Sequence, residues 1–90
     1  MKKSERIKIF DDAIANKSEI AVIVEFKDNE NFYYEFIINH NENLKFKKEY
    51  YNNSYDEEFR LKTNENIRII ALYEGAENIL IKLKDYLNAK

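Results

Sequence analysis

Residues 20–26 read Ile20-Ala21-Val22-Ile23-Val24-Glu25-Phe26, the most apolar window of the chain and one rich in β-branched side chains. Every even-numbered position is apolar, whereas the odd-numbered positions run Ala21, Ile23 and Glu25. This period-two pattern predicts a strand with one face buried and the other face partly buried. We therefore expect residues 20–26 to be the first strand of an antiparallel sheet that occupies most of the chain.

Four more segments alternate in the same way, and turns rich in Asn and Asp separate them. Asn and Asp tolerate turn backbones and bond to them, so the regular spacing predicts an antiparallel meander of five strands. The segment over 44–51 is the weakest of them, because it also contains good helix formers. The four further strands are predicted at 32–39, 44–51, 59–63 and 67–73.

Each predicted strand has one face that we expect to point into the core. Residues 20, 22, 24 and 26 form this face in the first strand. If Phe26 lies opposite Phe32 in a tight hairpin, the even-numbered residues of the second strand also point into the core. The inward residues of the later strands are then Leu44, Phe46, Tyr50, Phe59, Leu61, Ile67, Ile69, Ala71 and Tyr73.

Helices are predicted at the two ends of the chain, over 4–16 and 76–88. In the first helix, Ile7, Phe10 and Ile14 recur at steps of three and four. The second helix has a longer apolar stripe, made of Ala76, Ile79, Leu80, Leu83, Tyr86 and Leu87. Two helices of ~10 Å diameter can cover five strands spaced ~4.8 Å apart. The sequence thus predicts one α+β domain over 1–90, a two-layer sandwich in the order α-β-β-β-β-β-α with both terminal helices on one face.

The composition excludes several classes of protein. The chain has 90 residues, and 44% of them are hydrophobic, which is enough for a core and argues against global disorder. It has no Cys, so neither disulfides nor thiol chemistry is expected. No segment approaches the ~18 apolar residues of a membrane span, and we expect a cytoplasmic protein that does not associate with membranes. The abundance of Asn, Lys, Ile and Tyr indicates an AT-rich genome.

No motif for catalysis or cofactor binding stands out. A single glycine cannot form a phosphate-binding loop, and the Ser and Thr residues have no base partner by spacing. The acidic run over 56–58 lacks the alternating spacing of a calcium loop. We expect neither an enzyme nor a metal or cofactor site.

The outer face of the predicted sheet is the first candidate binding surface. If all the hairpins are tight, Lys47, Lys62 and Arg68 fall in one row across that face. A neighbouring row contains Glu25, Tyr33, Glu49, Arg60 and Ile70. Such a basic stripe suits an anion, which could be a nucleic-acid backbone, a nucleotide or an acidic protein surface. A solvated face with partial counter-charges is the alternative, and the net charge of −2 does not favour a dedicated DNA binder.

Apolar and tyrosine side chains supply a second candidate surface. Clustered exposed apolar residues often mark an interface, and the outer face is expected to carry Ile23, Tyr33, Ile37, Ile70 and Leu72. Tyrosines at and beside the predicted loop over 52–58 offer rigid area with a hydroxyl group. Of these, Tyr51 and Tyr55 can either bind a partner or simply pack the loop, and Tyr50 can be core.

We therefore expect a small non-catalytic protein-binding module. Size and composition would suit a phage or mobile-element protein that inhibits a host defence complex, as anti-CRISPR proteins do. An anion- or nucleic-acid-binding domain that uses the basic stripe is the alternative, and a homodimeric structural protein is a third option. The candidate partner-binding residues are Tyr33, Ile37, Lys47, Tyr51, Tyr55, Arg60, Lys62, Arg68 and Ile70.

Overall fold

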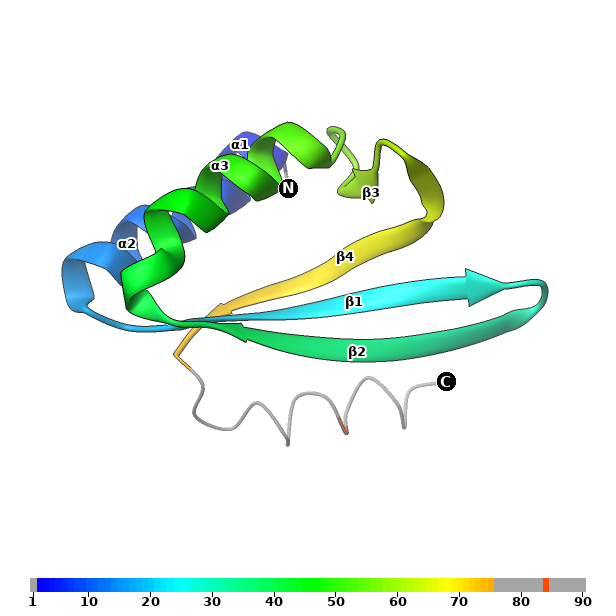
Figure 1. The fold of residues 1–90 in the computed structure, drawn as a ribbon, viewed down its shortest axis with the longest axis horizontal. Helices are drawn as coiled ribbons and strands as arrows, with labels where there is room; N and C mark the ends of the chain where they lie inside the picture. Colours follow the sequence, from blue (N-terminus) through cyan, green and yellow to red (C-terminus); the bar gives the residue numbers. More distant parts are fainter. Residues whose placement is uncertain (1, 76–83, 85–90) are drawn as a thin grey trace.

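The computed structural model describes residues 2–75 and 84. Four strands form one antiparallel sheet in the order β2-β1-β4-β3, so the apolar strand β1 is central (Figure 1). The helices α1, α2 and α3 all lie on one face, which we call the helix-side face; the opposite one is the far face. In chain order the elements are α1 (Lys3–Ile7), α2 (Ile9–Asn16), β1 (Ile20–Asp28), β2 (Asn31–Asn39), the 3-10 helix η1 (Asn41–Asn43), α3 (Leu44–Ser54), β3 (Arg60–Leu61) and β4 (Asn64–Glu74).

The α+β class and the antiparallel sheet are confirmed, but the strand predicted over 44–51 is wrong. This segment lies in the helix α3, and the loop predicted over 52–58 begins only after Ser54. The helix is favoured because Leu44 and Tyr51 lie about two turns apart and are both buried on one side of it. The sheet of the described chain therefore has four strands and is no meander. The predicted strand over 59–63 is reduced to β3.

The predicted N-terminal helix is confirmed as two short helices that meet at Lys8. It ends at Asn16, as predicted, and the next residue, Lys17, takes a left-handed conformation with φ 55°. The buried apolar side chains are Ile7, Phe10 and Ala13, whereas Ile14 is exposed. The helix predicted over 76–88 lies outside the described residues.

A buried lysine fastens α1 to the end of α3. The Lys3 Nζ donates hydrogen bonds to the backbone carbonyls of Asn52 and Tyr55, at 2.7 and 2.6 Å. A cation beside the C-terminal carbonyls of a helix is favourable, because those groups have no partner within the helix. Lys3 therefore acts as a structural residue, although its sequence context gives no sign of burial.

The hairpin between β1 and β2 differs from the predicted one by a single residue. Phe26 lies opposite Tyr33 and not Phe32, because only Asn29 and Glu30 form the turn. Asn29 accepts the required positive φ of 58°. A shift of one residue moves every side chain of a strand to the other face. The even-numbered residues of β2, expected in the main core, therefore lie on the far face, and Tyr33 and Ile37 lie on the helix-side face.

An extra residue in β4 exchanges the two faces of the sheet for the side chains that follow it. Its pairing with β1 shifts between Ile23 and Val24: Ile23 lies opposite Ala71 and Val24 opposite Ile69, so Ile70 is one extra residue in β4. Ile67 and Ile69 point towards the helices as predicted. After the shift, however, Leu72 joins that side, while Ala71 and Tyr73 lie on the far face.

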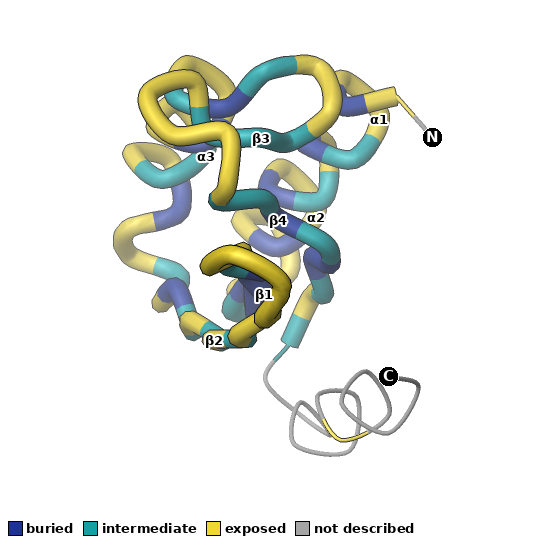
Figure 2. Tube along the Cα trace, turned by 90° about the vertical axis from the view of Figure 1, so that its right-hand side faces the viewer, coloured by how far each residue is buried: buried dark blue, intermediate teal, exposed yellow. Residues whose placement is uncertain are grey.

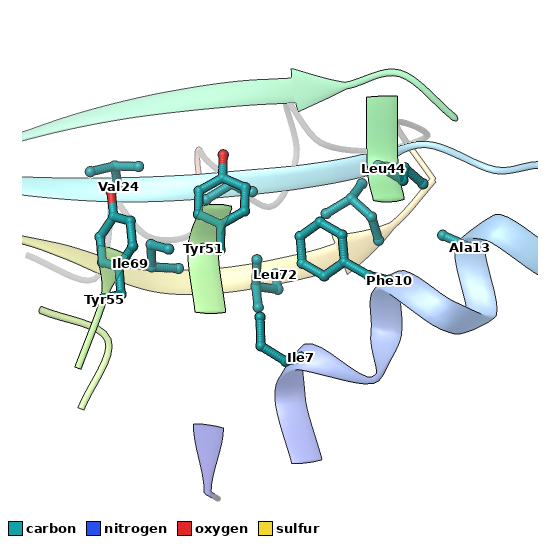
Figure 3. Close-up of a cluster of buried hydrophobic side chains, with 11 residues drawn as sticks. Ile7, Phe10, Ala13, Val24, Leu44, Tyr51, Tyr55, Ile69 and Leu72 are labelled. Atoms are coloured by element: carbon teal, nitrogen blue, oxygen red, sulfur yellow. The ribbon is translucent and has the colours of Figure 1, made fainter. Parts of the chain in front are cut away.

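Two apolar clusters result, one on each face of the sheet. The main core lies between the helices and the sheet and contains Phe10, Leu44 and Leu72 (Figure 3). The smaller cluster on the far face is built on Ala21, Ile23 and Ala71, with Tyr34, Phe36, Ile70 and Tyr73 packed against it. Figure 2 shows that the burial is concentrated along the middle of the fold, whereas the turn that joins β1 to β2 is exposed. β1 is thus a strand buried on both faces along residues 20–25.

Candidate functional site

The strand β2 forms one edge of the described sheet and carries few of the features that normally protect an edge. It is nine residues long, and its register with β1 is regular throughout. It contains no Lys, Arg or Pro, and Glu35 is its only charged residue. Soluble proteins usually protect edge strands with Lys, Pro, bulges or shortness, because the edge can pair with another chain. β2 therefore presents a long, regular edge that suits strand pairing.

The opposite edge of the described sheet differs in each of these respects. β3 has only two residues, its pairing with β4 is irregular, and one of the two residues is Arg60. Lys62 follows directly at the turn into β4. A short, charged and irregular edge strand discourages pairing with a strand of another chain. The two edges are thus unequal, and only β2 offers a continuous template.

Two of the predicted binding residues lie together on β2. Tyr33 is 54% exposed and Ile37 is 37% exposed, and both lie on the helix-side face with Glu35 between them. Both were predicted on the outer face of the sheet, away from the helices, and this placement is wrong because the register of the hairpin differs by one residue. Their exposure is nevertheless confirmed, and it adds an apolar and aromatic contact area to the hydrogen-bonding edge.

The helix α3 exposes an aromatic residue that the sequence interpretation missed. Phe46 is 68% exposed, although the predicted strand had it pointing inward. The helical spacing of Leu44 and Tyr51 was the signal that could have revealed it, because Phe46 lies on the other side of such a helix. Tyr50 is exposed as well, and the Lys47 Nζ lies 5.5 Å from the centroid of its ring, in cation–π range.

The predicted binding residues Tyr51 and Tyr55 belong to the core and not to the surface. Both are buried, with ring centroids 5.8 Å apart, and the ring of Tyr51 lies 5.7 Å from that of Phe10. The Asn39 Nδ2 donates a hydrogen bond of 3.3 Å to the Tyr51 hydroxyl. Tyr51 and Tyr55 had been candidates for the surface and Tyr50 for the core, but Tyr50 is the tyrosine that is exposed.

Burial of these two phenols makes the stability of the fold sensitive to alkaline pH. Burial, and then the neighbouring Tyr50, raise the pKa of Tyr55 from 10.0 to about 12, and burial also raises that of Tyr51. The unfolded chain loses the proton first, so the stabilisation is complete below pH 10 and is lost as the pH rises towards 12.

We expect the Tyr55 contribution to this loss to be about 1–2 kcal/mol between these pH values, as measured by urea unfolding. Tyr55→Phe should remove that share of the pH dependence, whereas the exposed control Tyr33→Phe should not. If the free energy of unfolding of Tyr55→Phe fell with rising pH as steeply as that of the parent, the result would contradict the buried position of this phenol.

The predicted basic row of Lys47, Lys62 and Arg68 does not form. Lys47 lies on α3, and Arg60, not Lys62, pairs with Arg68 across β3 and β4. Lys62 instead borders a shallow hollow together with Tyr50. A different polar row crosses all four strands on the far face, and in strand order it consists of Tyr34, Glu25, Arg68 and Arg60.

Glu25 is the buried centre of this row. Its Oε1 lies 3.6 Å from the Arg68 Nη2, and its Oε2 accepts a hydrogen bond of 3.1 Å from the Tyr34 hydroxyl. Arg60 donates to the carboxylate of Glu58. The predicted site residue Ile70 is half-buried against the far-face cluster, so it contributes little to an exposed surface.

The acidic run over 56–58 organises the loop before β3. The Asp56 Oδ1 accepts hydrogen bonds from the backbone N–H groups of Glu58 and Arg60, at 2.9 and 3.0 Å. The bond from Arg60 is the main reason that the pKa of Asp56 is lowered. Within residues 2–75 and 84, no three His, Cys, Asp or Glu side chains are grouped to hold a metal ion, and no helix is long and apolar enough to cross a membrane.

The described chain is thus a small α+β domain with a four-stranded antiparallel sheet and helices on one face of it. The comparisons with known proteins give no match, either to a family model, to a curated protein or to a solved structure.

Proposed function

We propose that this protein is a non-catalytic protein-binding module whose partner adds a strand to β2. The observation that carries the proposal is this edge of the described sheet, which is nine residues long, regular in register and contains no Lys, Arg or Pro. Strand addition is a recurrent form of recognition, in which main-chain hydrogen bonds supply affinity and the alternating side chains supply specificity.

The side chains of β2 support the same proposal. Tyr33 and Ile37 project from one face of the strand, and both are exposed. Tyrosine is enriched in interfaces because its rigid ring covers a large area at a small cost in conformational entropy. A partner strand beside β2 would bury part of both side chains while its backbone pairs with the edge.

The identity of the partner remains a prediction. Inhibition of a host defence complex by a phage or mobile-element protein is consistent with the small size and the composition. The simplest alternative partner is a second copy of the chain, because two β2 strands could pair about a two-fold axis.

The proposal is tested by placing a lysine on the edge. Ile37→Lys introduces the residue that proteins commonly use to protect edge strands, at a position that is already exposed. We expect it to abolish partner capture from lysates of host cells, or dimerisation in light scattering if the partner is a second copy. Folding should be retained, because surface changes usually alter the free energy of unfolding within about 0.5 kcal/mol.

Phe46→Lys is the matched control, because it makes the same kind of change at an exposed residue of α3 away from the edge. It should keep the partner. The proposal is wrong if Ile37→Lys retains every interaction of the parent. It is also wrong if the parent is monomeric and binds no protein of the host.

A further inference from the structure

The helix α3, which leads from the end of β2 to β3 (Figure 1), exposes two aromatic rings on one side. Phe46 and Tyr50 are 68% and 42% exposed, and they lie one turn apart, so they are neighbours on the surface of the helix. Among the described residues, no other aromatic ring packs on Phe46. Strand addition to β2 does not require this surface, so it needs an explanation of its own.

Two lysines lie beside Tyr50, and neither makes an ion pair with a carboxylate of residues 2–75. The Lys47 Nζ lies 5.5 Å from the centroid of the Tyr50 ring. Lys62 is exposed and borders the same hollow as Tyr50. By contrast, the Lys48 Nζ lies 2.8 Å from a carboxylate oxygen of Asp11. Lys47 and Lys62 therefore carry positive charge that no carboxylate neutralises, next to exposed aromatic rings.

The hollow beside Tyr50 gives this surface some depth. It encloses about 420 Å³, a volume in the range of small binding sites. Its border combines the apolar side chain of Leu61 with the polar groups of Asn53 and Thr63. An apolar side chain of a partner can enter such a hollow while a neighbouring carboxylate reaches Lys62.

We propose that this surface of α3 binds an acidic peptide segment of a partner protein, in which carboxylates are interspersed with apolar side chains. The carboxylates pair with Lys47 and Lys62, and an apolar side chain packs on the ring of Phe46. Exposed aromatic rings with a polar surround are common anchors of protein interfaces, because their burial supplies most of the binding energy. The site is separate from the edge of β2, and each of the two can be tested alone.

A nucleic acid fits this surface less well than a peptide does. Glu49 is exposed on the same helix, one turn from Phe46, and the whole chain has a net charge of −2. A nucleic-acid strand carries a negative charge on each phosphate and would be repelled by Glu49. A peptide can place an uncharged residue opposite this carboxylate.

The test is a titration of the full chain, labelled with nitrogen-15, with a synthetic peptide in which Glu, Leu and Pro recur in that order. The prolines lack a backbone donor and so disfavour strand addition to β2. We expect the resonances of Phe46, Tyr50 and Lys62 to shift, whereas those of Tyr33 and Ile37 on β2 should not. The affinity should fall as the salt concentration rises. Peptides with Gln in place of Glu, or Ser in place of Leu, should bind more weakly.

Variants of the surface separate its two contributions. Phe46→Ala should weaken binding of the peptide about tenfold, because it removes the apolar anchor. Lys47→Gln and Lys62→Gln should each weaken it about two- to fivefold, the usual effect of losing one exposed ion pair. Lys27→Gln is the matched control, since it removes an exposed charge from β1 and should bind the peptide as the parent does.

Three results would overturn the proposal. The peptide leaves the resonances of α3 unchanged, Lys47→Gln and Lys62→Gln bind it as tightly as the parent, or the peptide with Gln binds as tightly as the one with Glu. A short single-stranded oligonucleotide is the second probe. If it bound more tightly than the acidic peptide, the surface would be assigned to a nucleic acid whose bases stack on Phe46.

Discussion

Phe10→Ala should lower the free energy of unfolding by about 3–5 kcal/mol, the usual effect of truncating a fully buried phenylalanine. The Phe10 side chain has no exposed surface and contacts the core from α2, with its ring 5.7 Å from that of Tyr51. Figure 3 shows it between Leu44 and Leu72, where it joins α3 to the sheet. Its removal would leave a cavity between α2, α3 and the strand β4.

The whole fold of a chain of this size is stable by only about 5–15 kcal/mol. The loss should therefore lower the melting temperature by roughly 15–30 °C, or abolish the cooperative transition, as followed by circular dichroism. Phe32→Ala is the control, because that ring is half exposed on β2. Similar melting temperatures for the two variants would show that Phe10 does not join the helices to the sheet.

Leu44→Ala should cost about 2–5 kcal/mol, whereas Phe46→Ala should change the free energy of unfolding by no more than about 0.5 kcal/mol. Leu44 is fully buried at the start of α3, and Phe46 is the most exposed large apolar residue among those described. The pair distinguishes the helix from the strand predicted for this segment. In a strand the two side chains would point to the same face, and both truncations would be costly.

Urea unfolding of the two variants measures the difference directly. If Phe46→Ala destabilises the protein as much as Leu44→Ala does, residues 44–54 do not form a helix that is buried on one side only. Glu49→Ala is a suitable reference variant, because it lies on the same helix and is exposed.

Part of the candidate surface was predictable from the sequence, and part was not. Tyr33 and Ile37 were expected to be exposed on the outer face of the sheet; they are exposed, but the register of the hairpin places them on the helix-side face. The basic row failed because Lys47 lies on the helix α3 and because Arg60, not Lys62, lies opposite Arg68. Arg60 and Arg68 still came together, since the connection between β3 and β4 is short. The exposure of Phe46 was missed because residues 44–51 were read with the two-residue period of a strand, whereas they form a helix.

The sequence alone determined the α+β class, the position of β1 and β2, and the helical start of the chain. These features depend on local patterns: a run of β-branched residues, Asn-rich turns and apolar side chains at steps of three and four. The tertiary structure decided the segment over 44–54, whose helix formers and alternating apolar residues are compatible with both a helix and a strand. It becomes a helix because Leu44 and Tyr51 complete the core beside Phe10. The tertiary structure also decided which side chains of β2 and β4 face the helices. The Asn29-Glu30 turn and the extra residue Ile70 each shift a register by one position, and a shift of one position moves the side chains of a strand to the opposite face.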